Sequence, residues 1–126
     1  MKTLILIGVG SGLGGILRYW LSGVVAERIG ETFPWGTMSV NIIGSLLIGL
    51  LAAFVDSERI LMSPGGRQFL MMGVCGGFTT FSSFSLQTFR LMQDNEWLHA
   101  GGNILLSVVL CLLSVFVGYK LGQLVN

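Results

Sequence analysis

The 126-residue chain is 52% apolar and only 10% charged, and its formal net charge is +1. A soluble domain carries about a quarter charged residues, so seven basic and six acidic side chains are too few to cover a water-facing surface. The two cysteines exclude a disulfide-rich scaffold, and the irregular spacing of the 19 glycines excludes collagen. The small net charge offers no basic surface for nucleic acid. With a mean hydropathy of +0.80, the composition indicates an integral membrane protein.

Four uncharged stretches predict the membrane spans. They cover residues 3–17, 32–55, 68–89 and 97–119. A helix needs about 20 apolar residues to cross a hydrocarbon core about 30 Å thick. The last three stretches have that length, and the first reaches it when its helix continues past Arg18. We therefore predict an all-α, multi-pass protein of the cell membrane, with the bacterial inner membrane favoured. Its single domain, residues 1–126, has helices at 3–26, 34–55, 67–91 and 97–123.

A cleaved signal peptide is the alternative interpretation of residues 1–23, because Lys2 precedes an apolar run. Glycines at positions 8, 10, 12, 14 and 15 stand where a signal has a leucine-rich core, and Arg18 follows them. This pattern favours a first membrane helix.

The basic residues are divided almost evenly between the two sides of the predicted bundle. One side has Lys2, Arg59, Arg67 and Lys120, and the other has Arg28 and Arg90, with Arg18 nearer to it. Orientation in a membrane follows a clear excess of Lys and Arg on one side. The small difference found here permits insertion in both orientations.

Small and polar residues gather on one face of three predicted helices, at about 100° per residue. They are Gly8, Ser11, Gly14, Gly15, Arg18 and Ser22, then Thr37, Asn41, Gly44, Ser45 and Ala52, and finally Asn103, Ser107, Cys111, Ser114 and Gly118. Close helix packing explains most of the glycines. It explains Asn41 and the Asn103, Ser107 and Ser114 stripe less well, because hydrogen-bonding groups in hydrocarbon need partners or water. Packing and a polar path for a solute both remain open at this point.

The third predicted helix contains an unusual run, GVCGGFTTFSSFS, at residues 73–85. Adjacent glycines followed by threonine, serine and phenylalanine favour a break in the helix near residues 76–80. Broken backbone at membrane depth persists only inside protein or around a cavity, and carbonyls freed by a break can coordinate a bare cation. Phe81 and Phe84 share one face. Packing is the commoner role of such a pair, but the hydroxyl residues around it weaken that explanation.

The spans lack the usual groups of enzymes and proton-coupled carriers. All six carboxylates lie at the predicted turns, whereas a proton-coupled carrier commonly needs one inside the membrane. His99 lies near an interface, and Cys75 and Cys111 have no partners at metal-site spacing. The G-x-G-x-x-G match at residues 10–15 lacks the strand–turn–helix context that dinucleotide binding requires. We expect no enzyme. Arg18 is the one charged residue expected within a span, in a structural or vestibule role.

The segment GGFTTFSSFS at residues 76–85 resembles the signature of the Fluc/CrcB-type fluoride ion channels. The segments GGILRY at 14–19 and NIIG at 41–44 agree with it. The similarity covers nearly the whole chain, because the length, the four spans and the weak charge bias also match.

This resemblance implies an antiparallel, dual-topology homodimer in which two copies of the chain build two pores. Phe81 and Phe84 would be the aromatic residues that face the pore, and Asn41 would be an amide donor near them. Gly76 and Thr79 match the positions whose backbone carbonyls hold a structural Na⁺ at the dimer axis. The hydroxyl positions of the fluoride pathway match Ser82, Ser85, Ser107 and Ser114, whereas Asn103 and Cys111 stand where hydroxyl residues are expected.

The chemistry of fluoride agrees with these assignments. Because placing an ion in a hydrocarbon-like medium costs on the order of 20 kcal/mol, fixed N–H and O–H donors must replace its water shell. Phenylalanine ring edges carry partial positive charge and can face an anion without trapping it. A negative cell interior drives an anion outward with about 2.3 kcal/mol per 100 mV. The resemblance therefore implies passive export of cytoplasmic fluoride, with fluoride, a second copy and the lipid bilayer as partners and no nucleic acid.

Two other functions remain open from the sequence. A small four-helix, proton-coupled multidrug-type exporter shares the length and the number of spans, but it relies on a membrane-embedded glutamate in the first helix. This chain has none before Glu27. A non-transporting scaffold or membrane anchor is the other alternative, and Phe81→Ile or Asn41→Asp would then change no flux.

Overall fold

The computed structural model describes residues 1–57 and 62–126. Arg59, one of the basic residues counted above, lies outside the described residues. The long helices are α1 (Lys2–Ile29), α2 (Trp35–Asp56) and α6 (Trp97–Val125). Between α2 and α6 lie α3 (Pro64–Arg67), the π-helix η1 (Gln68–Cys75), α4 (Gly76–Phe78) and α5 (Phe81–Gln93).

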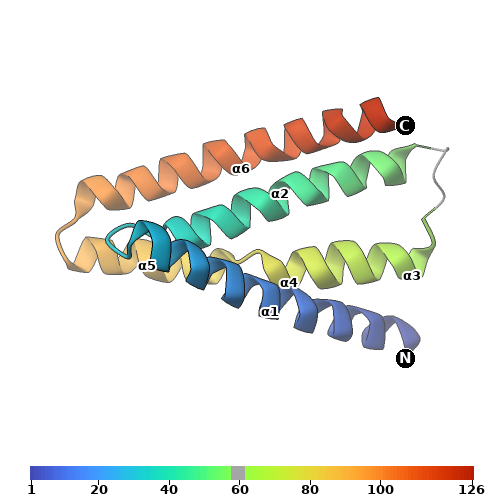
Figure 1. Ribbon diagram of the computed structural model, residues 1–126, viewed down its shortest axis with the longest axis horizontal. Helices are drawn as coiled ribbons and strands as arrows, with labels where there is room; N and C mark the ends of the chain where they lie inside the picture. The colour runs from blue at the N-terminus through green and yellow to red at the C-terminus, as the bar shows by residue number, and fades with distance from the viewer. Residues whose placement is uncertain (58–61) are drawn as a thin grey trace.

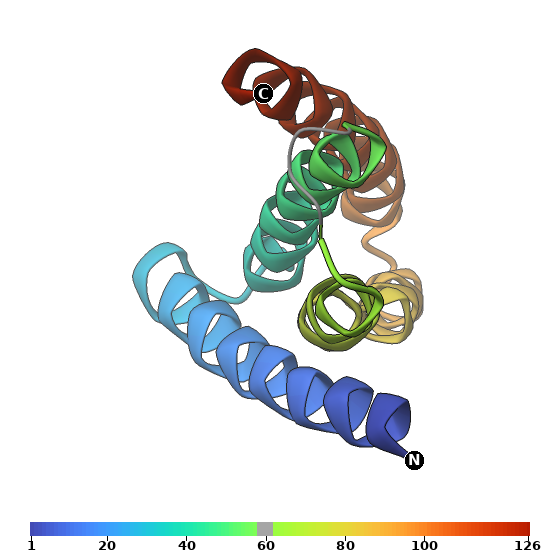
Figure 2. The same ribbon diagram turned by 90° about the vertical axis from the view of Figure 1, so that its right-hand side faces the viewer.

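Four helical units of the described chain are long and apolar enough to cross a membrane, which confirms the number of spans predicted. They are α1, α2, α6 and the combined unit Pro64–Gln93. The units run alternately up and down, so the two termini lie at the same end of the molecule (Figure 1). Seen end-on, α2 lies along α6, and α1 lies to one side against η1 and α4 (Figure 2).

The ends of the helices follow local sequence signals. α1 ends at Gly30, whose φ of +108° suits glycine and whose N–H donates to the carbonyl of Ala26 at 2.9 Å. Before α3, the Ser63 hydroxyl oxygen accepts the N–H of Gly66 at 3.0 Å. The turn between α5 and α6 contains Asn95 with a φ of 59°, a left-handed conformation that asparagine tolerates. These turns leave each pair of sequential spans antiparallel.

Two glycines of α1 bring it against the third span. A Cβ atom at Gly14 would overlap the carbonyl oxygen of Val74, and one at Gly10 would lie 2.5 Å from a backbone oxygen of η1. Gly8 has open space around it, and Gly15 has no closer neighbour than the Arg18 guanidinium. The contact face of α1 within the chain therefore contains Gly10, Ser11 and Gly14, of which Ser11 and Gly14 belong to the predicted face, whereas Gly8 and Gly15 of that face make no such contact. The four-residue spacing of Gly10 and Gly14 sets the actual line of contact.

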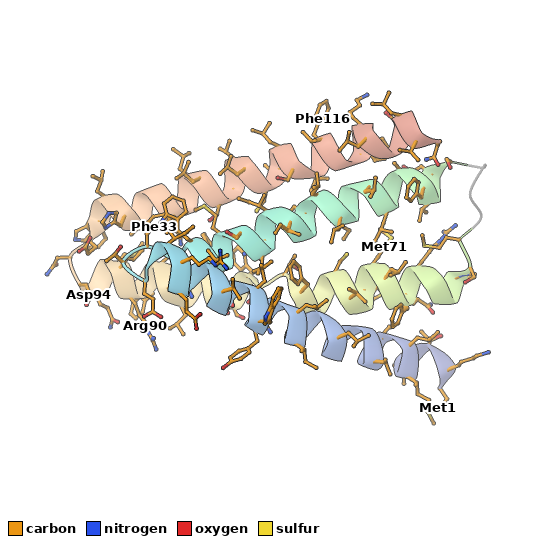
Figure 3. All side chains as sticks on the ribbon, viewed as in Figure 1. Met1, Phe33, Met71, Arg90, Asp94 and Phe116 are labelled. Carbon is orange, nitrogen blue, oxygen red and sulfur yellow. The ribbon has the colours of Figure 1, made fainter. Side chains whose placement is uncertain are left out.

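The outer faces of α1 and α6 are formed by large apolar side chains. Ile16, Leu112 and Phe116 are 68%, 67% and 61% exposed, and Phe116 points away from the bundle (Figure 3). Such faces suit hydrocarbon rather than water. This is the surface of a multi-pass membrane protein.

Candidate functional site

Two residues with extended backbone separate α4 from α5. Thr79 has φ −83° and ψ 156°, and Thr80 has φ −151° and ψ 115°. β-Branched side chains accept such conformations readily. The backbone groups of this segment therefore need partners other than those of a continuous helix.

The adjacent glycines before this segment remain helical. Gly76 has φ −63° and ψ −39°, and a Cβ atom at Gly77 would overlap the backbone of Ser11 in α1. Gly77 thus allows close packing of α4 on α1. The change in conformation lies at Thr79 and Thr80, within residues 76–80, and not at the two glycines that precede them.

Asn41 of α2 binds the extended segment with both ends of its amide group. Its Oδ1 accepts the N–H of Thr80 at 2.8 Å, and its Nδ2 donates to the Thr80 carbonyl at 3.0 Å. The backbone groups of Thr80 fix the orientation of the amide, since an N–H only donates and a carbonyl only accepts. The second Nδ2 hydrogen takes part in neither of these two bonds.

The side chain of Thr80 caps α5. Its Oγ1 accepts the N–H of Ser83 at 3.1 Å. In an uninterrupted helix, the N–H groups of Thr80 and Ser83 would bind the carbonyls of Gly76 and Thr79. Asn41 and Thr80 take these two N–H groups instead, so the carbonyls of Gly76 and Thr79 lose their usual helical partners.

A cavity of about 330 Å³ opens beside the extended segment, between α2, the third span and α6. Its lining residues are Asn41, Gly44, Ser45 and Ile48 of α2, Cys75, Gly76, Thr79, Thr80, Phe81 and Phe84 of the third span, and Ser107, Val108 and Cys111 of α6. It therefore combines one amide, several hydroxyl groups and two aromatic rings at the middle of the bundle. None of these lining residues, all from the described chain, carries a charge.

The rings of Phe81 and Phe84 lie next to each other at this cavity. Their centroids are 5.4 Å apart and their planes are inclined by 43°. Phe84 is half-buried, whereas Phe81 is 77% exposed. Most of the Phe81 side chain is therefore exposed on the surface of the single chain.

The four serines predicted for the pathway are not all at the cavity. Ser107 is buried and lines it. The Ser82 hydroxyl lies 3.3 Å from that of Thr80 but outside the lining. Ser85 and Ser114 donate to carbonyls one turn earlier, at 2.9 and 2.7 Å. The structure thus joins Ser107 to the aromatic pair, whereas the other three serines lie outside the cavity lining.

Arg18 does not line this cavity. Its side chain is half-buried, and its Nε is buried without a hydrogen-bond partner among the described residues. Gln87 has the same property at Oε1 and lines a second cavity, of about 950 Å³, at the end of the molecule that carries Arg90 and Asp94 (Figure 3).

Several residues of the site were not recognised from the sequence. Cys75 and Cys111, expected to be small apolar fillers, form part of the cavity wall, although Cys111 had been placed on the polar face of its helix. Their positions four residues from Thr79 and Ser107 were the available signal, since such pairs share a helix face. Thr88, which hydrogen-bonds both Phe84 and Asn103, had no signal that distinguished it from other helical threonines.

The fold and the site define an α-helical, multi-pass membrane protein with an uncharged, largely apolar cavity that carries a few amide and hydroxyl groups beside an extended segment of the third span. The sequence model of the family described as "CrcB-like protein, Camphor Resistance (CrcB)" matches residues 5–119, and the chain belongs to this family. This result confirms the resemblance found in the sequence.

Curated relatives cover all or nearly all of the chain. One is the "Fluoride-specific ion channel FluC" of Paramagnetospirillum magneticum, 50% identical over 127 residues, with 100% of this chain and 99% of the relative aligned. Proteins of the same name from Methylocella silvestris and Opitutus terrae are 51% and 52% identical, over 95% and 94% of this chain and 92% and 91% of the relatives.

Proposed function

We propose that this protein is a fluoride-specific ion channel that passively exports cytoplasmic fluoride and so protects the cell against its toxicity. The relatives described above bear that name. The observation that carries the proposal is the uncharged cavity where an amide and two phenylalanine rings meet an extended segment at membrane depth. Its role is transport rather than catalysis.

The cavity offers partial positive charge without a full cation. Asn41 has one Nδ2 hydrogen beyond its bond to Thr80. The start of α5, at Phe81, presents backbone N–H groups that have no partner within the helix and lies at the positive end of the helix dipole. The edges of the Phe81 and Phe84 rings add further positive potential. Such fixed donors can replace the water of a small anion while allowing it to leave.

A second copy of the chain completes the pathway. Phe81 is 77% exposed. Gly76 is exposed as well, and its own carbonyl has lost its helical partner. Lipid cannot satisfy such a backbone group. We therefore propose an antiparallel homodimer with a two-fold axis in the membrane plane, which pairs identical surfaces. The nearly even division of basic residues supports subunits inserted in both orientations, and each dimer would contain two pores.

The carbonyl oxygens at the extended segment are suitable ligands for a structural Na⁺ at the dimer axis. The carbonyls of Gly76 and Thr79 are hard oxygen ligands, and both N–H groups that would normally occupy them bind elsewhere. Unwound backbone carbonyls of this kind coordinate Na⁺ in membrane proteins. When bound, the ion would supply the positive charge that holds these carbonyls together across two copies.

The remaining residues are proposed to extend the path beyond the cavity. Ser107 contributes to the cavity wall, and Ser82 and Ser85 of α5 and Ser114 of α6 lie outside its lining. Arg18 is assigned a structural or vestibule role, because its partly buried guanidinium lies outside the cavity lining. The exporter alternative is not favoured, since no carboxylate lines the cavity among the described residues.

Growth in fluoride tests this proposal in cells. Expression of the chain in a bacterium that lacks its own fluoride export should restore growth in fluoride-containing medium. A Phe81→Ile variant that reaches the membrane in equal amount should restore it poorly. Equal growth of cells with and without the wild-type chain would contradict the proposal.

A further inference from the structure

A chain of buried hydrogen bonds connects α6 to the turn of α5 that carries Phe84. Asn103, on α6, is only 2% exposed and is one of the largest fully buried side chains. Its Nδ2 donates to the Thr88 hydroxyl at 2.9 Å. The Thr88 hydroxyl donates to the Phe84 carbonyl at 2.7 Å, and the Ser107 hydroxyl donates to Asn103 Oδ1 at 3.2 Å. Both ends of this chain, Phe84 and Ser107, line the cavity.

The direction of every bond in this chain is determined. The Phe84 carbonyl can only accept, so the single hydroxyl hydrogen of Thr88 points to it. The Thr88 oxygen must then accept from the Nδ2 of Asn103, which turns Oδ1 toward Ser107. Because Oδ1 can only accept, the hydroxyl hydrogen of Ser107 points to Asn103. Ser107 therefore turns its oxygen lone pairs, and not its hydrogen, toward the rest of its surroundings.

The bond between Asn103 and Thr88 is the only side-chain hydrogen bond between α5 and α6 that the described residues form. Within a membrane, association of helices depends on packing and on such bonds, because lipid is as apolar as the helices themselves. Thr88 and Ser107 are 5% and 6% exposed, so water does not substitute for a lost partner. Asn103 is thus joined through the Thr88 hydroxyl to the turn that carries Phe84.

We propose that Asn103 is a positioning residue of the ion pathway. It acts through Thr88 on Phe84, and its Oδ1 binds the hydroxyl hydrogen of Ser107. Asn103 does not itself line the cavity. This inference rests on the proposed fluoride conduction. It adds that a hydrogen-bonded network behind the cavity wall, and not only the groups facing the ion, sets the rate of passage.

The test compares single and paired substitutions in purified protein reconstituted in liposomes, with fluoride efflux followed by an electrode. Thr88→Val keeps the shape of the side chain but removes both hydroxyl bonds, and Thr88→Ser keeps the hydroxyl group. The double variant Thr88→Val with Asn103→Leu removes both polar partners of the bond between α5 and α6, and the Ser107 hydroxyl can then donate to the backbone carbonyl of residue 103, one turn earlier, so stability is restored more readily than when one partner stays unpaired. Thr3→Val, at the exposed start of α1, is the matched control.

A positioning role predicts that Thr88→Val lowers the efflux rate by about tenfold, the rate equivalent of one lost buried hydrogen bond. Thr88→Ser and Thr3→Val should keep the wild-type rate. The double variant should regain thermal stability but stay slow. Wild-type efflux from monodisperse Thr88→Val, or recovery of the rate together with stability in the double variant, would overturn the inference. If the wild-type chain released no fluoride in this assay, the proposed function itself would fail instead.

Discussion

Asn41 holds both backbone groups of Thr80, so at this position an amide is not interchangeable with a carboxylate. Asn41→Asp would replace the Nδ2 that donates to the Thr80 carbonyl at 3.0 Å with an oxygen that can only accept. It would also place negative charge in the wall that an anion must pass. Like charges brought together without water cost several kcal/mol, so we predict that fluoride efflux falls by about a hundredfold or more.

Asn95→Asp is the matched control for this substitution. Asn95 lies in the exposed turn between α5 and α6 with a left-handed backbone that aspartate also tolerates. The Asn95→Asp variant should keep the wild-type efflux rate in the same liposomes. Equal rates for wild type and Asn41→Asp, with both proteins folded, would remove Asn41 from the pathway.

Phe81 supplies a ring edge at the cavity but little packing within the chain, because 77% of it is exposed. Phe81→Ile keeps an apolar side chain and removes the aromatic edge. We predict about a fivefold slower efflux, the rate equivalent of roughly 1 kcal/mol, in protein that stays folded and monodisperse. Phe116→Ile, on the outer face of α6 (Figure 3), should change neither quantity. A normal rate for Phe81→Ile would show that this ring does not face the ion.

At the scale of the element, Gly14 determines how closely α1 approaches the third span. A Cβ atom at Gly14 would overlap the carbonyl oxygen of Val74, which is backbone and cannot turn aside. Gly14→Ala should therefore lower the free energy of unfolding by about 1–3 kcal/mol, as overpacking does in other cores. Thermal unfolding in detergent measures the change.

Gly101→Ala serves as the control for Gly14→Ala, since Gly101 is also helical and has open space around its Cβ position. Alanine in a helix is favoured over glycine by about 1 kcal/mol, so this variant should be at least as stable as the wild type. Equal stability of both alanine variants would mean that α1 lies farther from the third span than the structure indicates.

The elements were predictable from the sequence where a single physical rule decides them. Charges are costly in hydrocarbon, so the uncharged stretches between Arg67 and Arg90 or after Glu96 marked spans that the structure contains. The contact face of α1 was predicted only in part, with Ser11 and Gly14 but without Gly10, because small residues occur all round this helix. Which of them meet η1 depends on the position of a helix more than fifty residues away.

The hydrogen bonds of the site were beyond prediction from the sequence, although most of the participating residues were named. Asn41 and Thr80 are 39 positions apart, and Thr88 and Asn103 are 15 apart. Nothing local in the sequence pairs them, because only the packing of α2, α5 and α6 brings them together. The same applies to Ser85 and Ser114, whose hydroxyl groups bind their own helices, an option that residue type alone leaves open.

At the scale of the whole molecule, a sodium ion shared by two copies would make stability depend on that ion. A ligand that binds only the folded state stabilises it by RT ln(1 + [L]/Kd). We predict that the melting temperature of the purified protein rises with Na⁺ concentration and not with K⁺ at the same ionic strength. An identical response to the two cations would argue against the assignment of Gly76 and Thr79.

Two copies inserted in opposite orientations would make passage independent of direction and would place the termini of the two copies on opposite sides of the membrane. Single cysteines added near either terminus should therefore react with a membrane-impermeant reagent at comparable levels from both sides. The termini lie at one end of the chain (Figure 1), so a protein with one fixed orientation would react from one side only.

The most direct measurement is fluoride release from liposomes that contain the purified protein and potassium fluoride, with no proton gradient. Valinomycin lets K⁺ leave, and a fluoride electrode records the anion that follows. The account predicts rapid, protein-dependent fluoride efflux under these conditions and no comparable chloride efflux from matched liposomes. Fluoride retained until detergent is added, or released only when a proton gradient is imposed, would contradict it.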